Sequence, residues 1–575
     1  MPGPDNNHRI ERDSPPETFL PSYDQPTPET RTNTPREETA ERDLNETTFS
    51  PRARSLIIVL FLVTISIVPA IQFASDLARK QTPSILGILG GLLPPASSLR
   101  SPVAFWNAMP HHEELKSAEK SLETESVVSN FLLPWVQLGL TSFLGMGSDQ
   151  GCVGRDWWLF YRPDVEYVVG PAFLDPEQMV RRSHLGSQPD PVKAIVDFRD
   201  QLAARGIDLI IVPAPVKPAI DAGMLTGWPV PLVEYQNASY PEFVRRLQSN
   251  SVRLFDPAAV LMEAKVRAHG APLYLATDTH WRPESMESVA AALARAIKLP
   301  GPPAPVNYSV LTNRVSNLGD IGNMLRFPAG WTVFPHEQAT IHQVAIGNAL
   351  WRPSTDADIL LLGDSFSNIY SLEPMHWGEA AGFAEQLSRA LGRPMDCILR
   401  NDNGAFATRE FLSRELARGH DRLEGKKLVV WEFATRELAQ GDWKLLPLRL
   451  GVPPAASFLV LNPGQHAVIA GTVEAVSSVP RPRSVPYEDH IMTVELGDIS
   501  GAPASQAGCN SCVVCLFSMR GNVWTRAARL RPGDRVKVNV EPWDDVSATY
   551  DKFNHSDLDD PALQLQPPLW GSLAD

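Results

Sequence analysis

Residues 56–74, LIIVLFLVTISIVPAIQFA, constrain the fold more than any other stretch because they are almost continuously apolar. At 1.5 Å per residue, a helix of this length crosses the ~30 Å hydrocarbon core of a bilayer. A buried core helix is the alternative, but the polar tail before it offers almost nothing to pack against. A cleaved signal peptide fits poorly after so long a tail. The sequence therefore predicts a transmembrane helix over 55–76.

The flanks of this helix leave its orientation open. Arg52 and Arg54 stand on one side, and Arg79 and Lys80 on the other, so the positive-inside rule does not decide. Residues 1–54 are rich in proline and acidic residues and are predicted to form a disordered tail. Residues 77–140, with apolar stretches broken by prolines, are interpreted as a connector.

Composition limits the remaining possibilities. A chain of 575 residues with 43% hydrophobic residues is expected to form several domains with ordinary cores. Its net charge of −14 disfavours nucleic acid as a partner. Five cysteines are too few for a disulfide scaffold. Cys509, Cys512 and Cys515 form C-x2-C-x2-C without a fourth ligand, so a disulfide or ordinary thiols are favoured over a metal site.

From about residue 150, buried strands alternate with amphipathic helices. Expected strands are IDLIIVPAP (207–215), VRLFDP, LYLA (273–276), ADILLLGDSFS (357–367) and KLVVWEFA (427–434). Helices are expected between them, for example over 190–206 and 282–298, whereas 300–350 reads as irregular. This alternation predicts an α/β fold with a mostly parallel sheet covered on both faces. After about 450, short β-prone runs predict a small OB-like β-barrel over 455–575.

Two motifs lie at predicted strand ends and supply complementary chemistry. LATDTHW places Asp278 and His280 after one strand, and GDSFS places Ser365 after another. In parallel sheets such ends meet at one edge, where ligands bind. A serine hydroxyl needs a base to take its proton and a carboxylate to orient that base. A turn aspartate beside a surface histidine, and a helix-capping serine, are the non-catalytic alternatives. Asp364 is expected to hold the turn.

GDSFS resembles the first block of SGNH-type hydrolases, and DTHW upstream of it resembles the alginate O-acetyltransferase branch. In that branch the Asp-His pair precedes the serine. GRDWWLFYRPDVEYVVG (154–170) is similar to the opening element of the branch, with Trp157 where glycine is usual. Further elements similar to the branch are VPAPVKPAI (212–220), NLGDIGNML (317–325), GFAEQLSRALGRP (382–394) and KLVVWEFATREL (427–438). The resemblance covers roughly 150–445 and implies an SGNH-hydrolase-like domain over 141–450.

The resemblance implies roles for the site residues. Ser365 is the expected nucleophile, His280 the general base and acid, and Asp278 the orienting carboxylate. Oxyanion donors are expected from the Ser365 backbone and from Asn403 with Gly404, although Asn-Gly is equally a turn dipeptide. Trp281 is expected as a wall of the site or a core residue. The substrate-binding candidates are Trp281, Lys217, Arg409 and Arg436, each cation having solvent exposure as its default. No metal and no cofactor are expected.

An O-acyltransferase is the implied function. It moves an acetyl group through an acyl-serine to hydroxyls of an extracytoplasmic, alginate-like polysaccharide. A carbohydrate acetyl esterase with the same triad is the first alternative, and a non-catalytic polysaccharide-binding scaffold is the second. Family members work outside the cytoplasmic membrane, which implies a single-pass protein with a periplasmic catalytic domain. The acetyl donor is expected from a membrane-bound O-acyltransferase partner. The barrel either binds sugar through Trp524 and Trp543 or is a docking unit.

Overall fold

The computed structural model describes residues 50–574 apart from 79–125, 227–232, 302–305, 402, 452–457, 486, 504–505 and 507. The chain divides into two compact units, residues 1–130 and residues 131–575. Most of the predicted disordered tail and most of the predicted connector lie outside the described residues.

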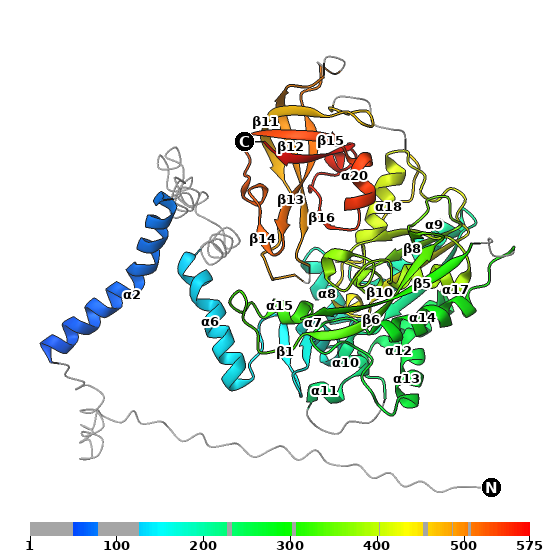
Figure 1. The fold of residues 1–575 in the computed structure, drawn as a ribbon, viewed down its shortest axis with the longest axis horizontal. Coiled ribbons are helices and arrows are strands. Elements are labelled where there is room, and N and C mark those ends of the chain that lie inside the picture. Colours follow the sequence, from blue (N-terminus) through cyan, green and yellow to red (C-terminus); the bar gives the residue numbers. More distant parts are fainter. Residues whose placement is uncertain are drawn as a thin grey trace, which may run out of the picture. The chain divides into compact units, whose positions relative to one another are not determined.

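A five-stranded parallel sheet lies at the centre of the second unit (Figure 1), in the order β4-β3-β10-β8-β9. Its strands are β3 (Asp208–Ala214), β4 (Arg253–Leu254), β8 (Ile359–Gly363), β9 (Asp396–Leu399) and β10 (Leu428–Ala434). Sequence reasoning found four of these strands and missed β9. Every residue of β8 and β10 is buried, so layers cover both faces of the sheet. The predicted α/β class is confirmed.

Helices connect the strands of this sheet. The longer ones are α7 (Arg162–Val169), α8 (Pro176–His184), α9 (Pro191–Ala203), α12 (Tyr240–Ser249), α13 (Pro257–Arg267), α14 (Pro283–Ala296), α17 (Phe383–Leu391) and α18 (Ala407–Ala417). Short helices are α10 (Lys217–Ile220), α11 (Gly223–Thr226), α15 (Asp320–Met324), α16 (Ser365–Asn368) and α19 (Glu437–Gln440). Several begin at a proline behind an aspartate cap, as α9 does after Asp190.

Two antiparallel elements accompany the main sheet. The hairpin β1 (Gly151–Val153) and β2 (Leu159–Tyr161) carries the GRDWWLFY segment. A second sheet contains β5 (Tyr308–Asn317), β6 (Glu337–Ile346) and β7 (Ala349–Leu350). The expectation of an irregular 300–350 is therefore wrong. Most of β5 is exposed, so its side chains carry little hydrophobic alternation from which a strand is read.

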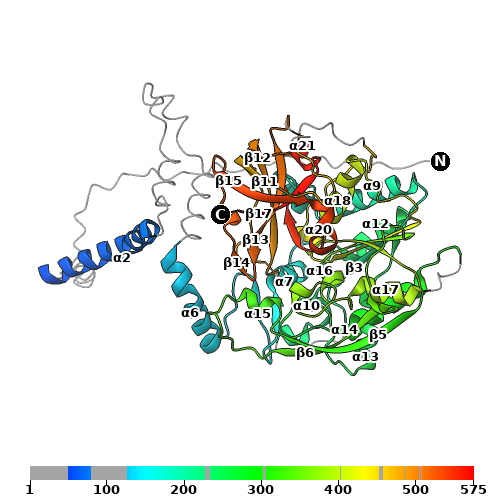
Figure 2. The same cartoon turned by 45° about the horizontal axis from the view of Figure 1, so that its top comes forward.

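The C-terminal region forms a closed five-stranded barrel, as predicted (Figure 2). Its strands are β11 (Ala467–Val476), β12 (His490–Ser500), β13 (Cys512–Arg520), β15 (Arg535–Pro542) and β17 (Pro568–Leu573). The β12–β13 pairing closes the ring, and β13 pairs in parallel with β17. This strand order is that of an OB-type barrel. The remaining elements here are β14 (Val523–Trp524), α20 (Trp543–Tyr550), β16 (Asn554–Ser556) and α21 (Pro561–Gln564).

The barrel shares a core with the part of the unit that contains the parallel sheet. Ile491, Phe553 and Trp570 belong to the same buried cluster as the parallel sheet. Trp524 is half-buried and donates to the Pro480 carbonyl, so it does not form the open aromatic face expected from the sequence. Cys512 and Cys515 are free thiols inside β13, where burial raises the pKa of both to about 12.

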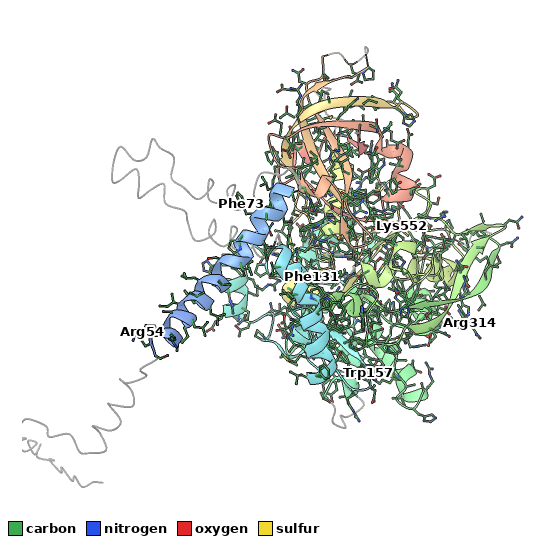
Figure 3. The ribbon with its side chains drawn as sticks, turned by 60° about the vertical axis from the view of Figure 1, so that its left-hand side comes forward. Arg54, Phe73, Phe131, Trp157, Arg314 and Lys552 are labelled. Carbon is green, nitrogen blue, oxygen red and sulfur yellow. The ribbon has the colours of Figure 1, made fainter. Side chains whose placement is uncertain are left out.

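Two helices in the described residues are long and apolar enough to cross a membrane. α2 (Pro51–Ala78) contains the predicted span. α6 (Val127–Leu144) lies in the segment interpreted as a connector and was not predicted as a membrane element. Figure 3 labels Arg54 and Phe73 on α2 and Phe131 on α6. Neither helix is buried by protein over more than a small part of its length.

Candidate active site

The DTHW segment is a tight loop rather than the end of a sheet strand. The predicted strand over 273–276 is wrong, because Tyr274 makes only an isolated bridge to Trp281. The loop is closed by the Leu275 N–H, which donates to the His280 carbonyl at 3.1 Å. Asp278 and His280 lie on this loop, and both are buried.

Asp278 is the centre of the loop's hydrogen bonding. Its Oδ1 accepts from His280 Nδ1 at 2.7 Å and from the His280 backbone N–H at 3.1 Å. Its Oδ2 accepts from Trp377 Nε1 at 2.9 Å and from the Asp320 backbone N–H at 3.0 Å. A carboxylate accepts only, so in the neutral imidazole the proton sits on Nδ1. His280 Nε2 therefore presents a lone pair, and it has no hydrogen-bond partner among the described residues.

Ser365 begins the short helix α16, directly after β8. The buried Asp364 caps this turn, since its Oδ1 accepts from the Phe366 N–H at 2.8 Å. Its Oδ2 accepts from the Ala434 N–H at 2.7 Å and ties the turn to β10. Beneath it, Glu432 Oε2 accepts from the Asp364 N–H and from Ser367 Oγ. Asp364 holds the turn, in line with the expected role.

The two motifs touch each other directly. The His280 ring packs against the Phe366 ring with a centroid distance of 4.9 Å, and Phe366 is the residue after Ser365. Trp281 Nε1 donates to the Phe366 carbonyl at 3.1 Å, and Tyr370 in turn donates to the Trp281 carbonyl at 2.7 Å. The structure thus brings the Asp278–His280 pair to the serine turn, although the two motifs lie far apart in sequence.

Charge and burial act in opposite directions on the histidine. Burial lowers the pKa of His280, but the hydrogen bond and charge of Asp278, helped by Asp320, raise it above the usual value overall. Burial opposes ionisation of Asp278, yet the bonds and charge of His280 lower its pKa overall. The pair therefore favours an ionised Asp278 beside a relatively basic imidazole, which suits a general base.

Asp320 is a functional residue that sequence reasoning missed. Its backbone N–H binds Asp278, its Oδ1 accepts from the Thr279 N–H at 2.8 Å, and its Oδ2 lies 3.8 Å from His280 Nδ1. Burial and the charge of Asp278 raise the pKa of Asp320 to about 7. Gly319 has φ 88°, and a Cβ there would lie 2.5 Å from the Thr277 carbonyl oxygen. The Gly-Asp pair in NLGDIGNML was the available signal.

Asp278, His280 and Asp320 lie close enough together to hold a metal ion. The donors around them argue against one. Four N–H groups already point at the two oxygens of Asp278, and a cation would need the same lone pairs. A hydrogen-bonded acid–base pair accounts for this geometry without a metal.

Arg436 is the substrate-binding candidate that lies near the pair. Its guanidinium carbon is 5.9 Å from the Phe366 ring centroid, and Nη1 is 3.1 Å from Asp164 Oδ1. Burial lowers the pKa of Arg436, but the charges of Asp164 and Asp364 raise it overall. Asp164 Oδ2 is buried without a partner among the described residues. Arg436 is thus a fixed cation near the serine turn.

Lys217 and Arg409 were expected as sugar-binding residues, but both are fully buried and cannot contact a sugar in this structure. Lys217 Nζ donates to the carbonyls of Leu159 at 2.5 Å, Ala276 at 2.8 Å and Asp278 at 3.1 Å. Arg409 donates to the carbonyls of Ala405 and Lys444. Trp281 is also fully buried, which favours the core interpretation. Lys217 positions the DTHW loop instead.

Asn403 and Gly404 lie beside the serine turn but in different ways. Gly404 is buried, and a Cβ there would lie 3.1 Å from Asp364 Oδ2. Asn403 is exposed with φ 50°, and its carbonyl accepts from the N–H groups of Phe406 and Ala407 at the start of α18. The hydrogen bonds of the Asn403 carbonyl therefore favour the interpretation of Asn403 as a turn residue. The absence of a side chain at Gly404 lets its own backbone lie close to Asp364.

Comparison with known proteins identifies a family for part of the chain. Residues 152–435 match the family model described as SGNH hydrolase-like domain, acetyltransferase AlgX. They form a domain of this family. Residues 152–435 are thus an SGNH hydrolase-like O-acetyltransferase domain.

Two relatives illustrate the similarity. A probable alginate O-acetylase AlgJ of Azotobacter vinelandii is 25% identical over 322 residues, which are 53% of this chain and 73% of the relative. The alginate biosynthesis protein AlgX of Pseudomonas putida is 22% identical over 264 residues, 44% of this chain and 52% of its own. The solved O-acetyltransferase domain of Pseudomonas putida AlgJ aligns at 22% identity over 51% of this chain and 93% of its own, with a TM-score of 0.38.

Removing the Asp320 charge should move the pH profile of the acetyltransferase. An imidazole acts as a base only when it is neutral, so an activity that uses His280 in this role should fall as pH drops through its raised pKa. Asp320→Asn keeps the acceptor for Thr279 but removes a charge that raises this pKa. The acid limb of kcat/KM for a small acetyl ester should therefore move to lower pH. The exposed Asp356→Asn serves as control, and an unmoved limb would limit Asp320 to packing.

Lys217→Met should separate positioning from sugar binding. Three carbonyls lose their donor, so the free energy of unfolding should fall by roughly 1–3 kcal/mol, measured by denaturant titration. Turnover should drop because the Asp278 loop loosens, while KM for a polysaccharide acceptor stays unchanged. Lys193→Met, at an exposed lysine on α9, is the matched control. A raised KM with normal stability would restore Lys217 as a substrate contact.

Proposed function

We propose that Ser365, His280 and Asp278 form the catalytic triad through which this O-acetyltransferase passes an acetyl group to polysaccharide hydroxyls. The buried Asp278–His280 pair, packed at 4.9 Å against the residue after Ser365, is the observation that carries the proposal. Asp278, His280 and Ser365 are all buried although their side chains are polar. Such a constellation is the requirement for an activated serine nucleophile.

The proposed reaction has two halves. His280 Nε2 takes the proton of Ser365 Oγ while Oγ attacks the acetyl carbonyl carbon of the donor. The donor leaves with the proton returned by His280, and an acyl-serine remains. A sugar hydroxyl then gives its proton to Nε2 and attacks the acyl carbon. As the bond between the acyl carbon and Oγ breaks, His280 returns that proton to Oγ and Ser365 is free again. Asp278 stabilises the imidazolium in both halves. The Ser365 N–H and the backbone at Gly404 are the proposed oxyanion donors.

Alginate or a similar polyuronate is the proposed acceptor. The names of the relatives include alginate O-acetylase, and this anionic polymer suits a site with a fixed cation. Arg436, held by Asp164 near the serine turn, is the proposed contact for a sugar carboxylate. Water in place of the sugar hydroxyl would make the same triad an esterase, so the acceptor decides between the two activities.

The proposed location is the outer face of the cytoplasmic membrane, with α2 as the anchor. The acetyl group would then come from a membrane-bound O-acyltransferase partner rather than from a cytoplasmic thioester. Residues 141–450 are the proposed catalytic domain, and 455–575 the barrel domain. Because the barrel contributes Ile491, Phe553 and Trp570 to the shared core, its proposed role includes packing as a fixed part of the enzyme.

Incubating the enzyme with an acetylated donor and an alginate oligosaccharide should give O-acetylated oligosaccharide. Mass spectrometry of a rapidly quenched sample should show an acetyl adduct on the peptide that carries Ser365. Ser365→Ala and His280→Ala should lower turnover on the order of 10⁴–10⁶-fold.

Ser288→Ala, at an exposed serine on α14, should leave turnover unchanged. Free acetate as the main product despite excess acceptor would identify an esterase. Normal turnover by folded Ser365→Ala would reject the triad.

Protease added to intact spheroplasts tests the proposed orientation. Residues 131–575 should be digested while an epitope placed at the N-terminus survives, since only α2 separates them across the bilayer. Detergent lysis should then expose the epitope as well. Survival of the catalytic domain together with loss of the N-terminal epitope would reverse the orientation.

A further inference from the structure

α6 has its polar and apolar sides reversed with respect to an ordinary surface helix. Thr141 is buried, and its Oγ1 donates to the Met146 carbonyl at 2.8 Å. Gln137 Nε2 donates to Thr141 Oγ1 and to the Gly147 carbonyl, each at 3.0 Å. Most of the outward side chains are apolar, with Phe131 68% and Phe143 87% exposed, although Asn130 and Ser142 are exposed as well. A helix that meets water places its polar residues outward.

The outward side forms a continuous apolar surface. It comprises Phe131, Leu132, Leu133, Trp135, Val136, Phe143 and Leu144, all of them exposed. Residues 127–144 contain no charged side chain. A large exposed patch of this kind marks a contact with another protein or with a membrane. Phe131 and the exposed Trp157 both lie on the side of the second unit that Figure 3 brings forward.

The middle of α6 packs on the catalytic domain, which argues against a second membrane crossing. Leu138 packs against a buried cluster that includes Ile321 and Phe334, and the Trp135 ring lies 5.5 Å from the Trp331 ring. A crossing helix would draw this surface into the hydrocarbon. The same loop region carries Arg326, whose guanidinium is 3.6 Å from Asp149. Charged side chains are expensive at that depth.

The start of α6 is joined to the membrane anchor. Gln72 lies near the end of the apolar run of α2, and its Oε1 accepts from the Val127 N–H at 2.9 Å. Its Nε2 donates to Asp76 Oδ1 at 2.9 Å, so both ends of the amide are used. The first turn of α6 therefore begins where α2 leaves the apolar layer. Because α6 begins beside the proposed anchor, lipid is the occupant that we infer for its apolar side.

We propose that α6 is an interfacial helix that lies in the plane of the membrane, with its apolar side inserted among lipid headgroups and upper acyl chains. Aromatic residues such as Trp135 and Trp331 suit that depth. The lipid contact itself is independent of the proposed acetyl transfer. The effect of lipid contact on the active site does rest on the proposed function. Leu138 packs against a cluster that includes Ile321 of α15. α15 begins at Asp320, beside the proposed triad. Lipid contact would hold this side of the active site close to the bilayer.

Depth-resolved fluorescence on the full chain tests the proposal. Leu132→Cys, Val136→Cys and Phe143→Cys lie along one stripe of α6 and are each labelled with an environment-sensitive fluorophore. Leu185→Cys, at an apolar residue 80% exposed on the catalytic domain, is the matched control. Labelling of the unmodified chain gives the background from the native cysteines. The proteins are reconstituted in phosphatidylcholine–phosphatidylglycerol vesicles that carry nitroxides near the headgroup or near the acyl-chain end.

All three α6 labels should show blue-shifted emission and stronger quenching by the shallow nitroxide than by the deep one. The Leu185 label should show neither. Strongest deep quenching at Val136, with shallow quenching at both ends, would establish a crossing helix and overturn the proposal. Labels that lipid does not quench would also overturn it, and disulfide-linked dimers through Phe143→Cys would then identify a second copy as the occupant.

Normal turnover of a small acetyl ester by each variant confirms that it is folded. Because the fluorescence measurement does not depend on acetyl transfer, it remains decisive even if the proposed acceptor or triad is rejected.

Discussion

The carboxylate of Asp278 is the point on which the active site depends. Four N–H groups from three segments of the chain converge on its two oxygens. A buried carboxylate is costly unless its lone pairs are satisfied, so these donors must be in place before the charge is stable. These donors come from the DTHW loop, the start of α15 and the Trp377 segment. The need to satisfy the carboxylate therefore fixes the positions of these three segments relative to one another. His280 is oriented as a consequence, since its backbone and its ring both bind Asp278.

Buried cations complete this arrangement in a way that surface salt bridges do not. Lys217 Nζ donates hydrogen bonds to three backbone carbonyls, two of them in the loop region. Burial lowers the pKa of Lys217 to about 8. Arg436 pairs with the fully buried Asp164. Neither cation has exposed surface comparable with a solvated side chain. Lys217 therefore fixes the geometry of the loop, and Arg436 places a fixed positive charge near the serine turn. Preorganised charges in a site with little water are more effective on a reacting group than the same charges in solvent.

Sequence reasoning succeeded where the signal was local and failed where it depended on tertiary contact. The strands that end at Ala214, Gly363 and Ala434 are short apolar runs, and their ends locate the serine turn. The run LYLA has the same appearance but pairs with nothing except Trp281, because a buried loop needs apolar residues as much as a strand does. In the same way, nothing in the sequence around Lys217 distinguishes a buried lysine that donates to three carbonyls from a lysine on the surface. Asp320 was not predicted because Gly-Asp occurs several times in this chain, and nothing in the sequence marks the pair at 319–320 as part of the site.

Hydropathy alone was enough to predict lipid contact for α2 but not for α6. α2 is apolar on all sides, which is what a helix surrounded by lipid requires, and a sequence window detects it at once. α6 mixes Ser, Asn, Gln and Thr with Leu, Phe and Trp, so the hydropathy of its most apolar window is lower than that of α2 and the segment was interpreted as a connector. The described contacts of Gln137 and Thr141 show that these two polar residues face the protein. Because these polar residues face inward, most of the exposed side chains of α6 are still apolar, and the exposed face of a helix determines which environment suits it.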